Sequence, residues 1–116
     1  MRVLVIDDDS VIGTLVSAVL SKEGFDVAVA TDGIAGLRAA ADATPDVVLV
    51  DSTMPGMAGA EVVAALRADP ATTSVPVVMM SADRTAAQQT DADAELPKPF
   101  APADLVATVR RVVPRQ

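Results

Sequence analysis

The sequence contains no cysteine, histidine, tryptophan or tyrosine, and phenylalanine, its one aromatic residue type, occurs only twice. Without cysteine the chain can form no disulfide, offers no thiol nucleophile and cannot build a cysteine-based zinc site. Without histidine it also lacks the imidazole that most often serves as a general base or metal ligand. Any chemistry must therefore come from carboxylates, hydroxyls, lysine and a bound cation.

Positive charge is also scarce, because 9 Lys and Arg residues face 16 Asp and Glu residues, which gives a net charge of −7. Such a surface repels a phosphate backbone, and only Arg110, Arg111 and Arg115 lie close together in the sequence. We therefore expect no direct binding of nucleic acid. The apolar stretches are too short for a signal peptide or a membrane span, so we expect a cytoplasmic location without membrane insertion.

The 116 residues match the usual size of one domain, and we expect a single domain over residues 1–116. Short valine-rich runs predict strands, and three of them are unbroken apolar runs typical of strands covered on both faces. The predicted strands are residues 3–6, 27–30, 47–50 and 75–80, with a weaker fifth around Leu96.

Segments of helical period separate these runs. The first predicted helix begins after a Ser10 cap and stops at Gly24, and the second starts near Asp32 with Ile34 and Leu37 on its apolar face. A third is predicted over residues 58–68 and a last one after Pro102. This alternation predicts an α/β fold, a doubly wound sandwich of three layers with a parallel sheet.

Acidic, hydroxyl and amino side chains stand where the predicted strands end, at the sheet edge where open parallel sheets bind ligands. These residues are Asp7, Asp8 and Asp9, then Asp51, Ser81 and Lys98. Two carboxylates about 4 Å apart repel by roughly 4 kcal/mol at an effective dielectric near 20, so their meeting requires Lys98, a divalent cation or both. Oxygen ligands alone favour Mg²⁺ or Mn²⁺, and such a site suits phosphoryl transfer to an aspartate.

Four strings in this order, VLVIDDDS, VVLVDSTMPGMAG, VVMMSA and LPKPF, resemble the receiver domains of two-component response regulators over the whole chain. The resemblance implies a flavodoxin-like fold with a five-stranded parallel sheet in the order 2-1-3-4-5. It implies that Asp51 is the phosphoacceptor. It further implies that Mg²⁺ binds Asp8, Asp51 and the backbone carbonyl of Thr53, with Asp7 acting through water.

The same resemblance gives roles to residues near the ends of the later strands. Lys98 would contact the phosphoryl group, Ser81 would move its hydroxyl onto it, and the Lys98–Pro99 bond would be cis. Thr53 and Asp83 would tune hydrolysis of the acyl phosphate. The implied donor is a phosphohistidine on a sensor histidine kinase or phosphotransfer protein, and the output is a changed surface for a downstream protein. Apart from self-phosphorylation and slow self-dephosphorylation, we expect no enzymatic activity.

Two features depart from the family pattern. Only 17 positions separate Ser81 from Lys98, which predicts a fourth helix that is short or missing. Glu95 stands where many members carry an aromatic residue that moves together with the conserved hydroxyl. A receiver-like interaction module with a degenerate switch is therefore an alternative function.

A phosphatase is the alternative from another class. Asp7, Asp9 and Val11 fit the DxDx[TV] opening of haloacid-dehalogenase-like phosphatases, in which Asp7 would be the nucleophile and Asp9 the general acid. Ser81 and Lys98 would then be the later hydroxyl and lysine. This interpretation explains neither Asp51 nor the Pro-Gly turn that follows it.

Overall fold

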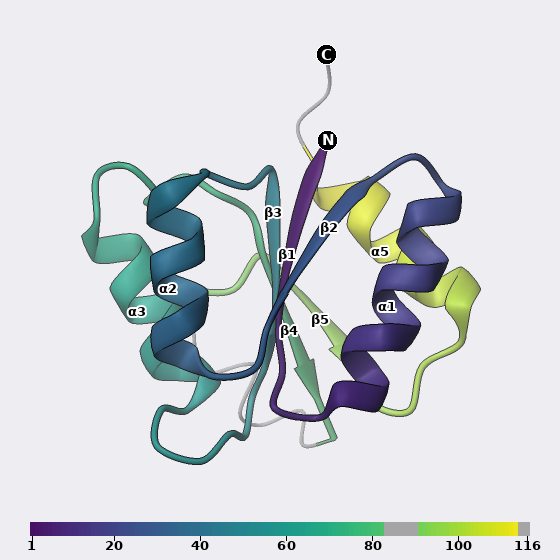
Figure 1. Ribbon diagram of the computed structural model, residues 1–116, viewed down its shortest axis with the longest axis horizontal. Coiled ribbons are helices and arrows are strands. Elements are labelled where there is room, and N and C mark those ends of the chain that lie inside the picture. Colours follow the sequence, from purple (N-terminus) through teal and green to yellow (C-terminus); the bar gives the residue numbers. More distant parts are fainter. Residues whose placement is uncertain (83–90, 114–116) are drawn as a thin grey trace.

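The computed structural model describes residues 1–82 and 91–113, which form one five-stranded parallel sheet flanked by helices (Figure 1). The strand order is β2-β1-β3-β4-β5, as the resemblance implied. The strands are β1 (Arg2–Ile6), β2 (Asp26–Ala30), β3 (Val47–Asp51), β4 (Val77–Ser81) and β5 (Ala94–Pro97). Their carboxyl ends share the lower edge of the sheet in Figure 1.

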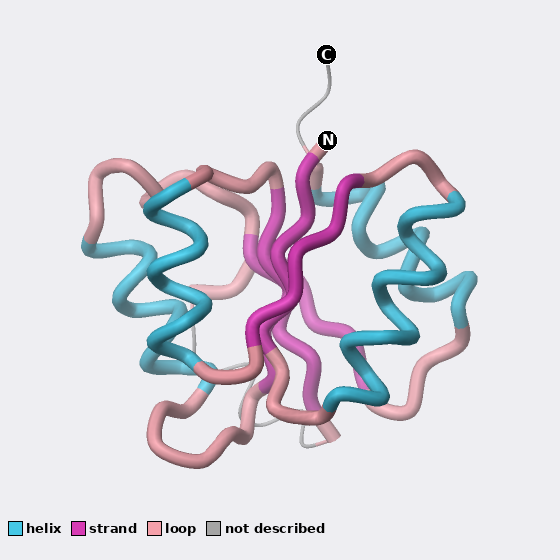
Figure 2. Tube along the Cα trace, in the orientation of Figure 1, coloured by secondary structure: helices cyan, strands magenta, loops and turns pink. Residues whose placement is uncertain are grey.

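The helices lie on both faces of the sheet, which confirms the three-layer arrangement (Figure 2). One face carries α1 (Ser10–Lys22) and α5 (Pro102–Val112), and the other carries α2 (Gly33–Asp42) and α3 (Gly59–Ala68). No helix within the described residues is long and apolar enough to cross a membrane. The expectation of a short or missing fourth helix concerns residues 83–90, which lie outside the described part of the chain.

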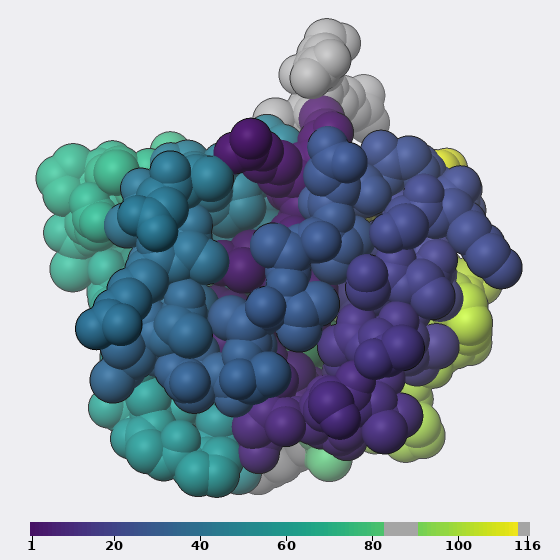
Figure 3. Space-filling model, viewed as in Figure 1, coloured from purple at the N-terminus to yellow at the C-terminus, as the bar shows by residue number. Residues whose placement is uncertain are grey.

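The central strands are buried on both faces, and every residue of β3 and β4 is buried. Alternate residues of β1, β3 and β4 join one of two apolar clusters, one beneath α1 and α5 and one beneath α2 and α3. The prediction of two covered faces is wrong for β2, where Ala28 is exposed and Val29 is 45% exposed. The reason is position, because β2 forms an edge of the sheet, uncovered between α1 and α2 in Figure 3.

The fourth strand begins two residues later than predicted. Pro76 has no N–H for the strand ladder, and its carbonyl accepts a hydrogen bond from Val48 N at 2.9 Å. Val75 N instead donates to Thr72 O, within the turn that precedes the strand. The regular pairing with β3 therefore starts at Val77.

The first two helices, α1 and α2, begin at aspartate caps. Asp9, not Ser10, caps α1, since Asp9 Oδ1 accepts the N–H of Val11 at 2.9 Å. Asp32 caps α2 through the N–H of Ala35, and α2 starts near Asp32 as predicted. At the other end of α1, Gly24 has φ 89°, a conformation that glycine adopts without strain, and it ends the helix as predicted.

The apolar face predicted for α2 is partly wrong, because Ile34 is 61% exposed. The helix turns Gly36 and Ala40 to the sheet instead, while Gly33 lies against Met57 in the loop after β3. A Cβ on Gly36 would lie 2.4 Å from Ile6 Cδ1, so α2 packs closer to β1 than a larger residue would allow.

Candidate functional site

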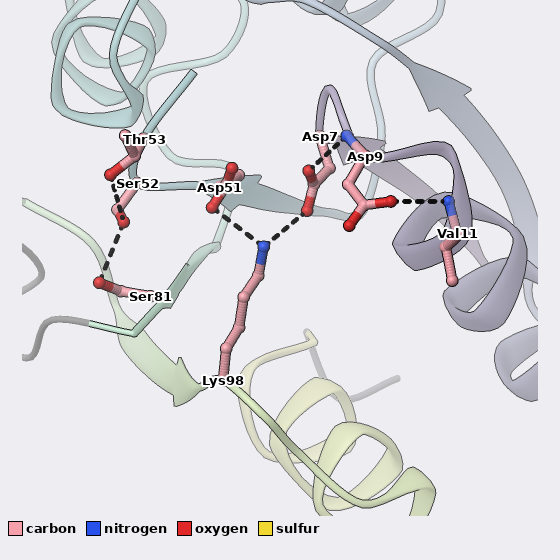
Figure 4. Close-up of polar contacts among 8 residues, drawn as sticks. All are labelled: Asp7, Asp9, Val11, Asp51, Ser52, Thr53, Ser81 and Lys98. Atoms are coloured by element: carbon pink, nitrogen blue, oxygen red, sulfur yellow. Dashed lines mark hydrogen bonds and ion pairs between the residues drawn. The ribbon is translucent and has the colours of Figure 1, made fainter.

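Lys98 joins two aspartates that end neighbouring strands (Figure 4). Its Nζ lies 3.0 Å from Asp7 Oδ2 and 3.1 Å from Asp51 Oδ1. Asp7 directly follows β1 and is fully buried, Asp51 ends β3, and Lys98 directly follows β5. The parallel sheet therefore brings together residues up to 91 positions apart in the sequence. This meeting is the convergence that the sequence predicts at the strand ends.

Asp8 completes a group of three carboxylates. Asp7, Asp8 and Asp51 each offer an oxygen that lies within 4.8 Å of the other two, and Asp8 is the exposed member. Asp7 Oδ1 also accepts the N–H of Asp9 at 2.9 Å, which fixes the orientation of its carboxylate. Three negative charges against one ammonium group leave a deficit of positive charge. These oxygen ligands fit Mg²⁺, which binds few carboxylates and keeps several waters.

The surroundings of Asp51 and Lys98 shift their pKa values. Burial raises the pKa of Asp51, and the charge of Asp7 adds to this effect, while hydrogen bonds from Lys98 and the Thr53 backbone oppose it. Burial alone would lower the pKa of Lys98, but its hydrogen bonds to Asp7 and Asp51 outweigh burial and raise it. Lys98 is therefore a cation at neutral pH, placed where negative charge would accumulate on Asp51.

Hydroxyl groups occupy the side of Asp51 toward β4. Ser52 Oγ donates a hydrogen bond to Ser81 Oγ at 3.0 Å, and Ser52 Oγ lies 3.5 Å from Thr53 Oγ1. Ser52 was not predicted from the sequence, because its place depends on the register between β3 and β4. The structure pairs Asp51 with Met80, so the next residues along the chain, Ser52 and Ser81, lie side by side.

The loop after β3 is held close to the site by glycines. Gly56 has φ 82° within the Pro-Gly turn. Gly59 N donates to Ser52 O at 3.1 Å, and a Cβ on Gly59 would lie 2.3 Å from Asp51 O. The first turn of α3 thus packs directly on the backbone that carries Asp51.

Three further expectations have different outcomes. The Lys98–Pro99 peptide bond is cis, as the resemblance implied. Asp83 lies outside the described residues. Asp9 does not belong to the group of three carboxylates, and its side chain caps α1 instead (Figure 4).

Comparisons with known proteins agree with this geometry. The model of the response regulator receiver domain family matches residues 3–110. The DNA-binding response regulator MtrA of Mycobacterium tuberculosis is 43% identical over 114 residues, which cover 94% of this chain and 49% of MtrA. The chain thus spans about half the length of the curated relatives it matches.

Solved structures share the fold over nearly the whole chain. The chemotaxis protein CheY4 of Vibrio cholerae superposes with a TM-score of 0.91 at 33% identity, covering 97% of this chain and 98% of that one. The receiver domain of the sensor histidine kinase PA1611 of Pseudomonas aeruginosa superposes with a TM-score of 0.89 at 28% identity, covering 96% and 95%. That receiver structure has a magnesium ion coordinated in its active-site cleft.

A parallel sheet in the order 2-1-3-4-5 with acids and a lysine at its carboxyl edge defines a receiver domain of two-component signalling. The family match covers most of the chain, so this chain belongs to the response regulator receiver domain family. Response regulators are signalling proteins that histidine kinases phosphorylate.

Proposed function

We propose that Asp51 is the phosphoacceptor of this receiver and that Asp7, Asp8, Thr53, Ser81 and Lys98 serve the transfer. The observation that carries the proposal is the pair of contacts from Lys98 Nζ to Asp7 and Asp51 beside the exposed carboxylate of Asp8. A carboxylate supplies the nucleophile, and the ammonium group lies next to it where the equatorial phosphoryl oxygens would come.

In the proposed step, a carboxylate oxygen of Asp51 attacks the phosphorus of a phosphohistidine. A P–O bond forms, the P–N bond breaks, and the electron pair returns to the imidazole, which takes up a proton. Lys98 neutralises negative charge on the phosphoryl oxygens, and Ser81 donates a hydrogen bond to one of them afterwards. When bound, Mg²⁺ supplies further positive charge to these oxygens.

The ligands proposed for the ion are Asp8, Asp51 and the backbone carbonyl of Thr53 directly, with Asp7 through water. Asp7 suits the indirect role because it is fully buried and its Oδ2 already accepts a hydrogen bond from Lys98. Mn²⁺ prefers similar oxygen ligands, so we propose that it can replace Mg²⁺.

The proposed partners are a sensor histidine kinase or phosphotransfer protein as donor and a downstream protein as receiver of the signal. We propose no direct contact of this chain with nucleic acid, because its net charge is −7. MtrA is named as DNA-binding, but this chain corresponds to about half of that protein. A donor kinase acts on regulators in the cytoplasm, where we place this domain.

The proposal is tested by mixing the chain with acetyl phosphate and Mg²⁺ and recording intact mass over time. We expect the gain of one phosphoryl group, which is lost on adding EDTA or in the Asp51→Asn variant. Asp42→Asn, an exposed change on α2 with the same effect on charge, is the matched control and gains the group normally. An Asp51→Asn variant phosphorylated at the wild-type rate would refute the assignment.

The same sample tests the alternative of a degenerate switch, which Glu95 motivates. Glu95 is partly buried, and its side chain forms no hydrogen bond or ion pair with the residues that the structure describes. We expect phosphorylation to change amide NMR shifts in β5 and α5 as well as at the site. Shifts confined to the immediate neighbours of Asp51 would favour an interaction module.

A further inference from the structure

The hydrogen bond between Ser52 and Ser81 sets the orientation of the hydroxyl that the proposed function assigns to phosphoryl binding. Ser81 is only 3% exposed, and Ser52 Oγ donates to its Oγ at 3.0 Å. In Figure 4, Ser81 Oγ points to Ser52 and away from the carboxylate of Asp51. In this orientation the Ser81 hydroxyl is directed at Ser52 and not at Asp51.

The backbone holds the two serines in register. Ser52 N donates to Met80 O at 2.9 Å, and Lys98 N donates to Ser81 O at 2.9 Å, so Ser52 is tied to β4 and Ser81 to the start of the loop after β5. A change in the Ser81 hydroxyl position therefore requires rotation of its side chain between staggered rotamers, not movement of the strands.

We propose that Ser52 is a positioning residue that holds the Ser81 hydroxyl turned away from Asp51 before phosphorylation. The proposal rests on the proposed function, because it concerns the hydroxyl that would bind the phosphoryl group. The site then has two states, one with Ser81 on Ser52 and one with Ser81 on a phosphoryl oxygen. A hydrogen bond present in only the first state lowers the affinity for the phosphoryl group by about three- to tenfold.

The first measurement needs neither metal nor phosphate. Three-bond NMR couplings of Ser81 report its χ1 rotamers in the wild type, in Ser52→Ala and in Ser52→Thr, which keeps the hydroxyl. We expect one dominant Ser81 rotamer in the wild type and in Ser52→Thr, and a redistributed population in Ser52→Ala. Identical couplings in all three proteins would overturn the proposal.

The second measurement is a titration with beryllofluoride in the presence of Mg²⁺, followed by amide NMR shifts. Relative to the wild type, Ser52→Ala should bind this phosphoryl analogue about three- to tenfold more tightly, and Ser52→Thr within about twofold. In a Ser81→Ala background, Ser52→Ala should have no effect, because the group it positions is gone.

The outcomes separate this inference from the proposed function. A wild type that binds no beryllofluoride contradicts the proposed phosphoacceptor site, while the rotamer measurement still decides the role of Ser52. A wild type that binds normally, together with Ser52→Ala of unchanged affinity, overturns the positioning role and leaves the phosphoacceptor proposal intact.

Discussion

Asp8 differs from its two neighbours in having no positive partner. Lys98 contacts Asp7 and Asp51, whereas no cation contacts Asp8 among the residues that the structure describes. An unpaired charge beside two other carboxylates costs stability unless a cation binds. The carboxylate of Asp8 therefore favours ion binding at the expense of the metal-free fold.

We predict that Asp8→Asn stabilises the metal-free protein. The change removes the repulsion among the three carboxylates, so the melting temperature in EDTA should rise by about 2 to 5 °C. Calorimetry or circular dichroism measures the shift, and Asp42→Asn controls for the change in net charge. A lower melting temperature for Asp8→Asn in EDTA would contradict the proposed crowding.

At the level of residues, the sequence predicted those side chains whose positions depend only on where strands end. Asp7, Asp51 and Lys98 meet because parallel strands share a carboxyl edge. Ser52 was missed because its role depends on the register between β3 and β4, which the sequence pattern does not define. The sequence could not show that Asp9 rather than Ser10 caps α1, because aspartate and serine are about equally good caps.

The start of α3 connects an element of the fold to the site. Gly59 is buried, and the two atoms nearest to an added Cβ would be backbone atoms, Asp51 O at 2.3 Å and Ser52 Cα at 2.8 Å, ahead of the Met79 Sδ at 3.0 Å. Backbone atoms of a central strand cannot move aside without disturbing the sheet. The helix must therefore shift if Gly59 gains a side chain.

We predict that Gly59→Ala lowers the free energy of unfolding by about 2 kcal/mol, although alanine favours helices more than glycine does. It should also slow phosphorylation by acetyl phosphate, since the displaced helix would shift the backbone next to Asp51. Denaturant unfolding and intact mass measure the two effects.

The neighbouring Ala60→Gly, at an exposed position of the same helix, is the matched control for this prediction. It should cost about 0.5 to 1 kcal/mol and leave the phosphorylation rate unchanged. A Gly59→Ala variant as stable as the wild type would show that the contact is relieved without cost.

Helices and strands were predictable where the apolar period is regular, but which side of each element is buried was not. The period of α2 predicted a helix, but Ile34 is exposed because close packing on Ile6 requires Gly36 at the contact. The apolar run of β2 predicted a buried strand, and its valines and alanines lie at a sheet edge. Both errors concern which neighbour an element meets, and a single sequence carries little information on that.

For the whole molecule, strand and helix alternation predicted the three layers, and the resemblance supplied the strand order. That order places β1 between β2 and β3, so the chain leaves β1 toward α1 on one face and leaves β3 toward α3 on the other. Open α/β sheets bind ligands in the crevice between two such loops, which leave adjacent strands toward opposite faces. The three carboxylates lie there, on a molecule whose net charge is −7.

These charges lead to a prediction on the stability of the whole domain. An ion that binds only the folded chain raises the free energy of unfolding, by about 2.7 kcal/mol at one hundred times its dissociation constant. We expect MgCl₂ to raise the melting temperature well beyond KCl of the same ionic strength, because screening of a net negative charge stabilises equally in both salts. The difference in melting temperature between the two salts should largely vanish in Asp8→Asn, which loses a proposed ligand. It should persist in Asp42→Asn. Equal melting temperatures of the wild type in the two salts would show that the three carboxylates hold no ion, and the proposed Mg²⁺ dependence of phosphorylation would fail with them.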